Sequence, residues 1–183
     1  MLVLVLALSA CSSSRSLHRS SAILGSTIVM PVRGILPWEL TPNFGVARDG
    51  GARPHDGLDI MAPEGREALA CVSGVMQIMR WNALGGNAIW LKGDDGMSYY
   101  YGHLSAYREG MSEGTHVMAA EVIGYVGSTG DAQGKAPHLH FEVHTEKGSP
   151  AIDPYPVLHQ DGVLVMPMLD APEAAKKVGK RKP

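Results

Sequence analysis

The chain has 183 residues, of which 45% are hydrophobic, and a formal net charge of −2 at pH 7. This length is typical of one domain and is enough to bury about 70% of the surface that the unfolded chain exposes. A charge so close to neutral does not indicate nucleic-acid binding, so we expect no nucleic-acid partner and infer function from local motifs.

The amino terminus carries a short apolar run over residues 2–8, followed by Leu8-Ser9-Ala10-Cys11. This pattern resembles the cleavage motif of a bacterial lipoprotein signal peptide. It predicts a signal peptide over residues 1–10, lipid on Cys11 and an exported protein anchored to a membrane, facing the periplasm or cell wall. The run is shorter than the roughly 20 apolar residues of a spanning helix. No Lys or Arg precedes it, so a start further upstream or simple secretion remain alternatives.

The two ends of the chain differ from its middle in composition. Residues 11–30 are rich in serine, which is typical of a flexible tether. Residues 161–183 form a C-terminal extension with a basic tail, which we interpret as a solvated end, with contact to anionic polymer or lipid headgroups as the alternative. Its basic residues are Lys176, Lys177, Lys180, Arg181 and Lys182. A lipidated Cys11 leaves only Cys71, so we expect no internal disulfide and a buried Cys71.

The middle of the chain has short apolar runs separated by Gly, Asn and Asp, without long helical periodicity. This pattern is typical of many strands joined by tight turns, and it predicts an all-β or β-rich domain with few or no long helices. The expected strands cover residues 71–80, 88–92, 97–104, 116–118, 122–126 and 138–144.

His138-Leu139-His140-Phe141-Glu142 alternates polar and apolar residues, as a strand with one buried face does. His138 and His140 therefore project from the same face. At a rise of about 3.3 Å per residue they lie roughly 7 Å apart, so one can bind a metal while the other lies beside it.

A second cluster, His55-Asp56-Gly57-Leu58-Asp59, contributes an imidazole and a carboxylate. In a straight strand these groups would be about 13 Å apart, but Asp-Gly favours a turn that can bring His55 toward Asp59. Together with one histidine of the His-x-His pair they would form a site with three protein ligands. Such a site suits zinc better than calcium or magnesium and leaves one position for water, as catalytic zinc sites do.

A third motif, Tyr99-Tyr100-Tyr101-Gly102-His103, is also strand-like. Tyr99, Tyr101 and His103 alternate along it, so we expect them on one side and take His103 as a further imidazole at the site. The two tyrosines can line a groove or fill a half-buried sheet face. The chain lacks a His-Glu-x-x-His motif, so a histidine beside the metal must transfer protons.

Three histidine motifs in this order, His55-x-x-x-Asp59, Tyr101-x-His103-Leu104 and His138-x-His140, resemble the lysostaphin-type (LytM-like) zinc endopeptidases of bacterial peptidoglycan. The resemblance runs from about residue 31 to 158. Further matching stretches are Phe44-Gly45, Asp59-Ile60-x-Ala62-Pro63-x-Gly65, Ser73-Gly74, Gly85-Gly86-Asn87, Gly124-Tyr125-Val126-Gly127-Ser128-Thr129-Gly130 and Asp153-Pro154. The chain departs from the family at Arg66-Glu67, where members usually carry a small or apolar pair, and at Ala119-Ala120-Glu121, which replaces a segment that often contains glycine.

The resemblance implies a zinc peptidase domain over residues 31–160, with antiparallel sheets forming an open groove and one Zn²⁺ per chain at its floor. By position, His55, Asp59 and His140 would bind the zinc. His103 and His138 would be catalytic, one as general base and the other stabilising the oxyanion, and the assignment between them stays open. The implied reaction is hydrolysis of peptide cross-links in peptidoglycan. The alternatives are a non-catalytic relative that binds and activates other cell-wall hydrolases, and a wall-binding module with structural zinc.

The remaining histidines lack such motifs, and we interpret His18, His116, His144 and His159 as surface or structural residues. His144 and Glu142 nevertheless share the predicted face of His140. Glu142 can therefore accept a hydrogen bond from a ligand imidazole, with a solvated or structural role as the alternative.

Overall fold

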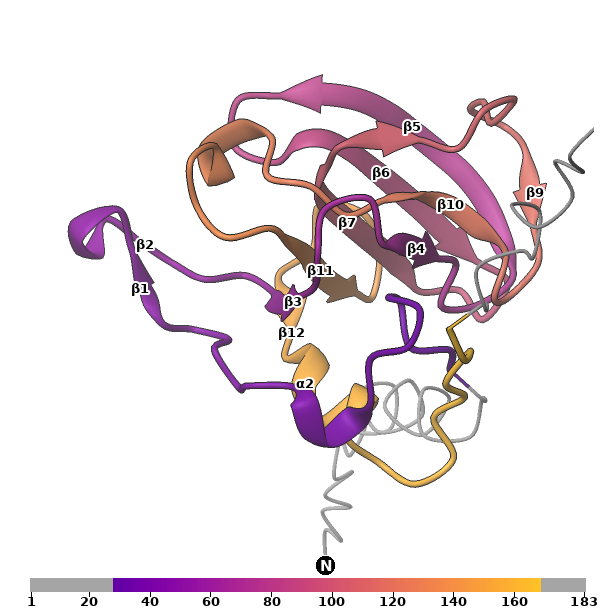
Figure 1. Cartoon of the computed structure of the whole chain (residues 1–183), viewed down its shortest axis with the longest axis horizontal. Helices are drawn as coiled ribbons and strands as arrows, with labels where there is room; N and C mark the ends of the chain where they lie inside the picture. Colours follow the sequence, from indigo (N-terminus) through magenta and orange to yellow (C-terminus); the bar gives the residue numbers. More distant parts are fainter. Residues whose placement is uncertain (1–27, 169–183) are drawn as a thin grey trace, which may run out of the picture.

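The computed structural model describes residues 28–168. The predicted signal peptide, Cys11, His18, most of the predicted tether and the basic tail lie outside these residues. The described residues form three antiparallel sheets with only short helical turns (Figure 1). The prediction of a β-rich domain of antiparallel sheets is therefore confirmed. No helix in residues 28–168 is long and apolar enough to cross a membrane.

The largest sheet has seven strands and forms the centre of the molecule. Six of them lie in the order β12-β11-β7-β6-β5-β9, and β3 pairs with the same edge of β11 as β12 does. The strands are β3 (Leu58–Met61), β5 (Gly74–Asn82), β6 (Gly86–Gly93), β7 (Ser98–Leu104), β9 (His116–Val117), β11 (His138–His144) and β12 (Ala151–Ile152). Figure 1 shows β5, β6 and β7 as long neighbouring ribbons across the top of the molecule.

Two smaller sheets flank the large one. The order β4-β10-β8 gives a three-stranded sheet, and β1 and β2 form a hairpin that projects to the left in Figure 1. Their strands are β1 (Ala47–Arg48), β2 (Arg53–Pro54), β4 (Glu67–Leu69), β8 (Ala106–Tyr107) and β10 (Val122–Tyr125). The helical turns are η1 (Pro37–Glu39), η2 (Asp49–Gly51), η3 (Gly130–Ala132) and α2 (Pro154–Leu158).

All six strands expected from the sequence occur, with ends shifted by a few residues. The largest shift is at β5, which begins at Gly74 because the residues before it bend away. There the backbone N–H of Cys71 donates to the hydroxyl of Tyr101, 2.9 Å away, and Cys71 is fully buried as expected. The unpredicted elements are two to five residues long, too short for an apolar pattern to develop.

The hydrophobic core lies on one face of the large sheet. Leu139, Phe141 and Val143 alternate along β11 and are fully buried, as the sequence pattern predicted. Tyr99 and Tyr101 pack against Phe141 with ring centroids 6.1 and 5.3 Å away, so both tyrosines belong to the core and not to a groove. The opposite face of β11 is left for polar side chains.

The two ends of the described chain are joined to each other. Val29 and Leu164 form a parallel bridge, and the N–H of Met30 donates to the carbonyl of Leu164 at 2.9 Å. Gly34 N–H likewise donates to the carbonyl of Met166 at 2.9 Å. Residues 163–168 belong to the region expected as a C-terminal extension, and they complete the packing around the N-terminal segment.

Candidate metal centre

The register between β3 and β11 brings Asp59 beside His140. The two residues are direct partners in this antiparallel pair, so their side chains project from the same face at neighbouring positions. Leu58 and Ile60 alternate with Asp59 and are buried in the core, which fixes the outward direction of the carboxylate.

His55 reaches the same point from the loop between β2 and β3. Its N–H donates to the carbonyl of Val46 at 2.9 Å, and its carbonyl accepts from Gly45 N–H at 2.8 Å. Gly57 lets the chain pass close to β11, because a Cβ atom there would lie 2.6 Å from the carbonyl oxygen of Phe141 and 2.8 Å from the His140 ring. The expected bend at Asp-Gly thus places His55 next to Asp59.

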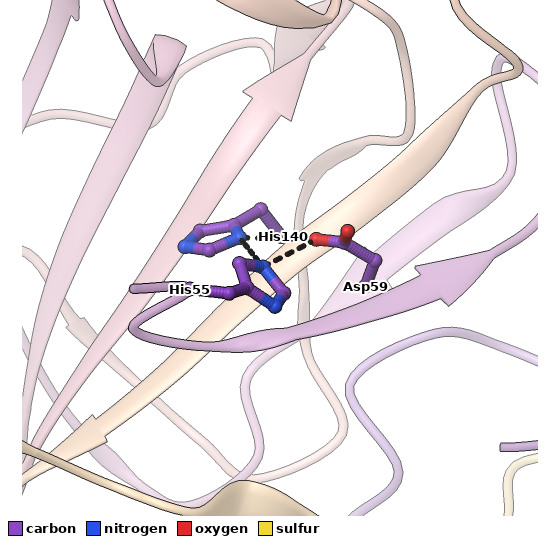
Figure 2. A group of neighbouring side chains, drawn as sticks. All are labelled: His55, Asp59 and His140. Carbon is purple, nitrogen blue, oxygen red and sulfur yellow. Dashed lines mark hydrogen bonds and ion pairs between the residues drawn. The ribbon is translucent and has the colours of Figure 1, made fainter. Parts of the chain in front are cut away.

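Three donor atoms form a nearly equilateral triangle (Figure 2). His55 Nε2 lies 2.9 Å from Asp59 Oδ1 and 3.0 Å from His140 Nδ1, and His140 Nδ1 lies 3.1 Å from Asp59 Oδ1. Ligand atoms around tetrahedral zinc, with bonds of about 2.0–2.1 Å, lie roughly 3.3 Å apart. The spacing of these atoms therefore fits a single small metal ion, and the three residues are a group that could hold one.

The outer nitrogens of both imidazoles face acceptors that cannot donate. His55 Nδ1 lies 2.8 Å from the carbonyl oxygen of Asn43, and His140 Nε2 lies 2.8 Å from Glu142 Oε1. Each outer nitrogen therefore carries a proton, so in the neutral ring the inner nitrogen presents a lone pair. Asn43 also accepts from the N–H of Asp59 through its side chain, at 3.2 Å. The donor chemistry thus fits a zinc ion as well as the distances do.

The charges around His140 favour a cation at this point. Burial opposes protonation of His140, but hydrogen bonds to Asp59 and Glu142 outweigh it and raise its pKa to about 9. Burial likewise opposes ionisation of Asp59, but hydrogen bonds from His140 and His55 lower its pKa well below the ordinary range. Two ionised carboxylates therefore flank the imidazole, an environment that also suits a metal cation.

Glu142 links His140 to a further buried histidine. Its Oε2 accepts from His144 Nε2 at 2.6 Å, and His144 Nδ1 in turn donates to the carbonyl of Ser149 at 2.6 Å. Burial opposes ionisation of Glu142, but the hydrogen bonds from both imidazoles lower its pKa to about 2. Glu142 thus does accept a hydrogen bond from His140, and His144 is a structural residue whose two nitrogens both have partners.

His103 and His138 lie beside the triangle without joining it. His138 Nε2 is 3.8 Å from Asp59 Oδ1, and the rings of His103 and His138 have centroids 4.9 Å apart. The Nδ1 atoms of His103 and His138 donate to the carbonyls of Thr129 and Ala136, both at 2.9 Å, so each Nε2 is free to accept a proton. Burial and the neighbouring histidines lower the pKa of His103 to about 4.

The argument that placed His103 by alternation with Tyr99 and Tyr101 is wrong, although His103 does line the pocket. Between the pairs Ile89–Tyr101 and Asn87–Leu104, β7 contains one residue more than β6, so β7 has a bulge there. His103 has φ +62°, a left-handed conformation that reverses the alternation. It therefore lies on the side opposite to the two buried tyrosines.

A glycine contact between two loops holds this bulge in place. The His103 N–H donates to the carbonyl of Gly85 at 2.6 Å. The next residue, Gly86, has φ +61°, and a Cβ there would lie 2.1 Å from Thr129 Oγ1 and 2.6 Å from the backbone nitrogen of Gly130. The two loops can approach this closely because Gly86 and Gly130 have no side chain. Together the loops hold the His103 backbone, through Gly85, and the His103 ring, through Thr129.

All five side chains proposed from the sequence line one pocket. The β1–β2 hairpin contributes Arg48 and Arg53 to its wall, and the sheet contributes Trp90 and Tyr100. Sequence analysis did not find Asn43, Arg48 or Tyr100. Of these three, Tyr100 could have been found most easily from the sequence. It lies between two tyrosines of the core, so alternation places its side chain on the pocket side of β7.

The comparisons with known proteins agree with this geometry. Residues 53–154 match the sequence model of Peptidase family M23. The chain belongs to this family. The resemblance to lysostaphin-type endopeptidases seen in the sequence is thereby confirmed.

Relatives within family M23 are similar over most of this chain. It is 34% identical over 137 residues to the L-Ala-D-Glu endopeptidase of Bacillus subtilis strain 168, covering 70% of this chain and 41% of that protein. The solved structure of a putative glycyl-glycine endopeptidase LytM from Ruminococcus gnavus aligns with TM-score 0.64 and 30% identity, over 77% of this chain and 63% of that one. The catalytic domain of lysostaphin from Staphylococcus simulans aligns with TM-score 0.54 and 30% identity, over 76% and 97%. The chain thus spans less than half of the Bacillus relative.

Proposed function

We propose that this M23 chain is a zinc-dependent endopeptidase that hydrolyses peptide cross-links of bacterial peptidoglycan. The observation that carries the proposal is the triangle of His55 Nε2, Asp59 Oδ1 and His140 Nδ1, with sides of 2.9 to 3.1 Å. In their neutral form both imidazoles point a lone pair inward, because their outer nitrogens donate to Asn43 and Glu142. We assign these three residues as the ligands of one Zn²⁺.

The chemistry follows from what lies beside the ligands. Zinc, when bound, lowers the pKa of water toward about 7 and polarises a carbonyl oxygen. His103 and His138 hold their Nε2 lone pairs at the pocket, so one of them accepts the proton of the attacking water as general base. The protonated imidazole becomes a donor and can pass this proton to the leaving amine. The other histidine donates a hydrogen bond to the oxyanion that develops on the carbonyl when its Nε2 carries a proton.

The same geometry supports a hydrolase over the two alternatives from the sequence, which are a non-catalytic activator of other hydrolases and a wall-binding module with structural zinc. A relative that only binds and activates other hydrolases has no need of an intact donor set, and this chain retains all three donors. A structural zinc site needs a fourth protein ligand, and the metal-binding group found among residues 28–168 has three members.

The location of the protein is part of the proposal. The lipoprotein-like sequence that ends at Cys11 supports export and a lipid anchor, and peptidoglycan lies outside the cytoplasm. Mass spectrometry of protein from a membrane fraction would detect acyl chains on Cys11. A Cys11→Ala variant that stays in the same fraction would contradict the anchor.

Incubation with purified sacculi tests the activity. The zinc-loaded protein should release soluble peptides with new amino groups, because amide hydrolysis exposes one amine for each bond cut. A chelator should stop the release and added zinc should restore it. A His140→Ala variant provides the control, and release equal to that of the wild-type protein would contradict the proposal.

A further inference from the structure

Arg48, in strand β1 of the hairpin, contacts the Asp59 carboxylate at the oxygen that does not face His55 and His140. Its Nη2 donates to Asp59 Oδ2, while the other oxygen, Oδ1, faces His55 and His140. The two oxygens of Asp59 thus have different partners: one points toward the candidate metal centre, and the other is held by a guanidinium group.

The hairpin by itself does not favour this arrangement. Arg48 and Arg53 are direct partners across β1 and β2, and like charges at opposed positions destabilise a sheet. Arg53 is neutralised by Asp49 and Asp131, at 2.6 and 2.9 Å. For Arg48, Asp59 is the acidic partner in the described residues. The position of Arg48 is therefore explained by Asp59 and not by the hairpin.

A second observation shows that the position of Arg48 costs free energy. Its Nε atom is buried and has no hydrogen-bond partner within residues 28–168. An unpaired buried N–H loses its hydration without compensation, so such groups are rare unless they serve another purpose. The contacts indicate that Arg48 is held here for the hydrogen bond from its Nη2 to Asp59.

We propose that Arg48 is a positioning residue that restricts Asp59 to binding the metal through Oδ1 alone. This inference rests on the proposed zinc site. A carboxylate can offer one or both oxygens to a metal, and a second oxygen would occupy a further coordination position. Catalytic zinc needs one position free of protein ligands. By holding Oδ2, the permanently charged guanidinium keeps this position available for water.

The test replaces zinc with Co²⁺, whose visible absorption is strong in four-coordinate sites and weaker in five-coordinate sites. The variants are Arg48→Gln, Arg48→Lys and, as a matched control from the same hairpin, Arg53→Gln. We expect Arg48→Gln to bind one Co²⁺ with a clear loss of absorption intensity. Arg48→Lys keeps a charged donor and should recover part of the intensity, and Arg53→Gln should match the wild-type spectrum.

Activity gives a second readout for the zinc-loaded protein. Loss of a group that orients a metal ligand typically costs about 10–100-fold in affinity or activity. We expect kcat of Arg48→Gln to fall by about this factor with little change in KM, because Arg48 acts through Asp59. Thermal unfolding of each metal-free variant shows whether it folds, and if Arg48→Gln does not, the comparison of Arg48→Lys with Arg53→Lys replaces it.

The outcomes separate this inference from the proposed function. If the wild-type protein binds neither Zn²⁺ nor Co²⁺, the proposed zinc site itself is wrong. If the wild-type protein binds Co²⁺ and the spectrum of Arg48→Gln is unchanged, only the role of Arg48 is overturned. An equal loss of intensity in Arg53→Gln would also overturn it, because the effect would then belong to the hairpin as a whole.

Discussion

The protons of the four pocket histidines are placed by acceptors that lie outside the metal centre. Each outer nitrogen donates to a carbonyl or carboxylate oxygen, so each inner nitrogen is free to bind a metal or a proton. The acceptors are Asn43 for His55, Thr129 for His103, Ala136 for His138 and Glu142 for His140. The candidate metal centre therefore depends on residues that lie outside the donor triangle.

Replacing His103 and His140 by alanine should separate catalysis from metal binding. His103 lies outside the donor triangle, so His103→Ala should retain zinc and lose about 10²–10⁴-fold in hydrolysis of sacculi, the usual contribution of a general acid–base group. His140→Ala removes a donor and should lose both. Zinc content by elemental analysis and peptide release together check this, and loss of zinc from His103→Ala would place it among the ligands.

A Glu142→Gln substitution tests the link between His140 and His144. Glu142 accepts from both imidazoles, whereas the glutamine side chain has one acceptor oxygen and an NH₂ group that can only donate. One imidazole then faces a donor, and we expect zinc affinity to weaken by about 10–100-fold. Competition with a chelator measures this. The exposed Glu146→Gln is the control, and equal affinities of the two variants would refute the expectation.

Single elements show where alternation along the sequence succeeds and where it fails. In β11 it predicts both faces correctly, because the strand pairs without interruption with β7. In β7 it holds as far as Tyr101 and fails at His103, because the bulge adds a residue. The bulge depends on contacts with the Gly85-Gly86 and Thr129-Gly130 loops, which are distant in sequence. A local pattern cannot encode them.

The segment Ala119-Ala120-Glu121, where the family often has glycine, contains a strained residue. Ala120 has φ +69°, a conformation that costs a residue with a Cβ roughly 1–2 kcal/mol. We expect Ala120→Gly to stabilise the protein by about 1 kcal/mol. Urea unfolding checks this against Ala52→Gly, whose φ of −70° is ordinary and which should not gain stability. A less stable Ala120→Gly would show that chain entropy outweighs the strain.

At the scale of the whole molecule, the described N- and C-terminal segments stabilise each other. Leu164 N–H donates to the carbonyl of Ile28 at 2.8 Å, and Val163 and Val165 pack against the buried core. This pairing closes the fold on the side away from the β1–β2 hairpin (Figure 1).

Shortening the chain at two points tests this pairing. Removal of residues 163–183 deletes these hydrogen bonds and uncovers Ile28 and Met30, so we expect a loss of roughly 3 kcal/mol or more. Removal of residues 169–183 deletes only residues beyond the described structure and serves as the control. Thermal and urea unfolding of both proteins measure the difference, and equal stability would show that residues 163–168 contribute nothing.

The sequence by itself determined the fold class, the main strands and the family, because periodicity and short motifs are local properties of the chain. It also identified five of the residues that line the pocket, since each of these belongs to such a motif. Only the tertiary structure decided how they meet: the register of β3 on β11, the bulge at His103, and the contacts of Asn43 and Arg48. These features depend on backbone atoms and loops that are far apart in sequence, so their geometry exists only once the sheets have packed.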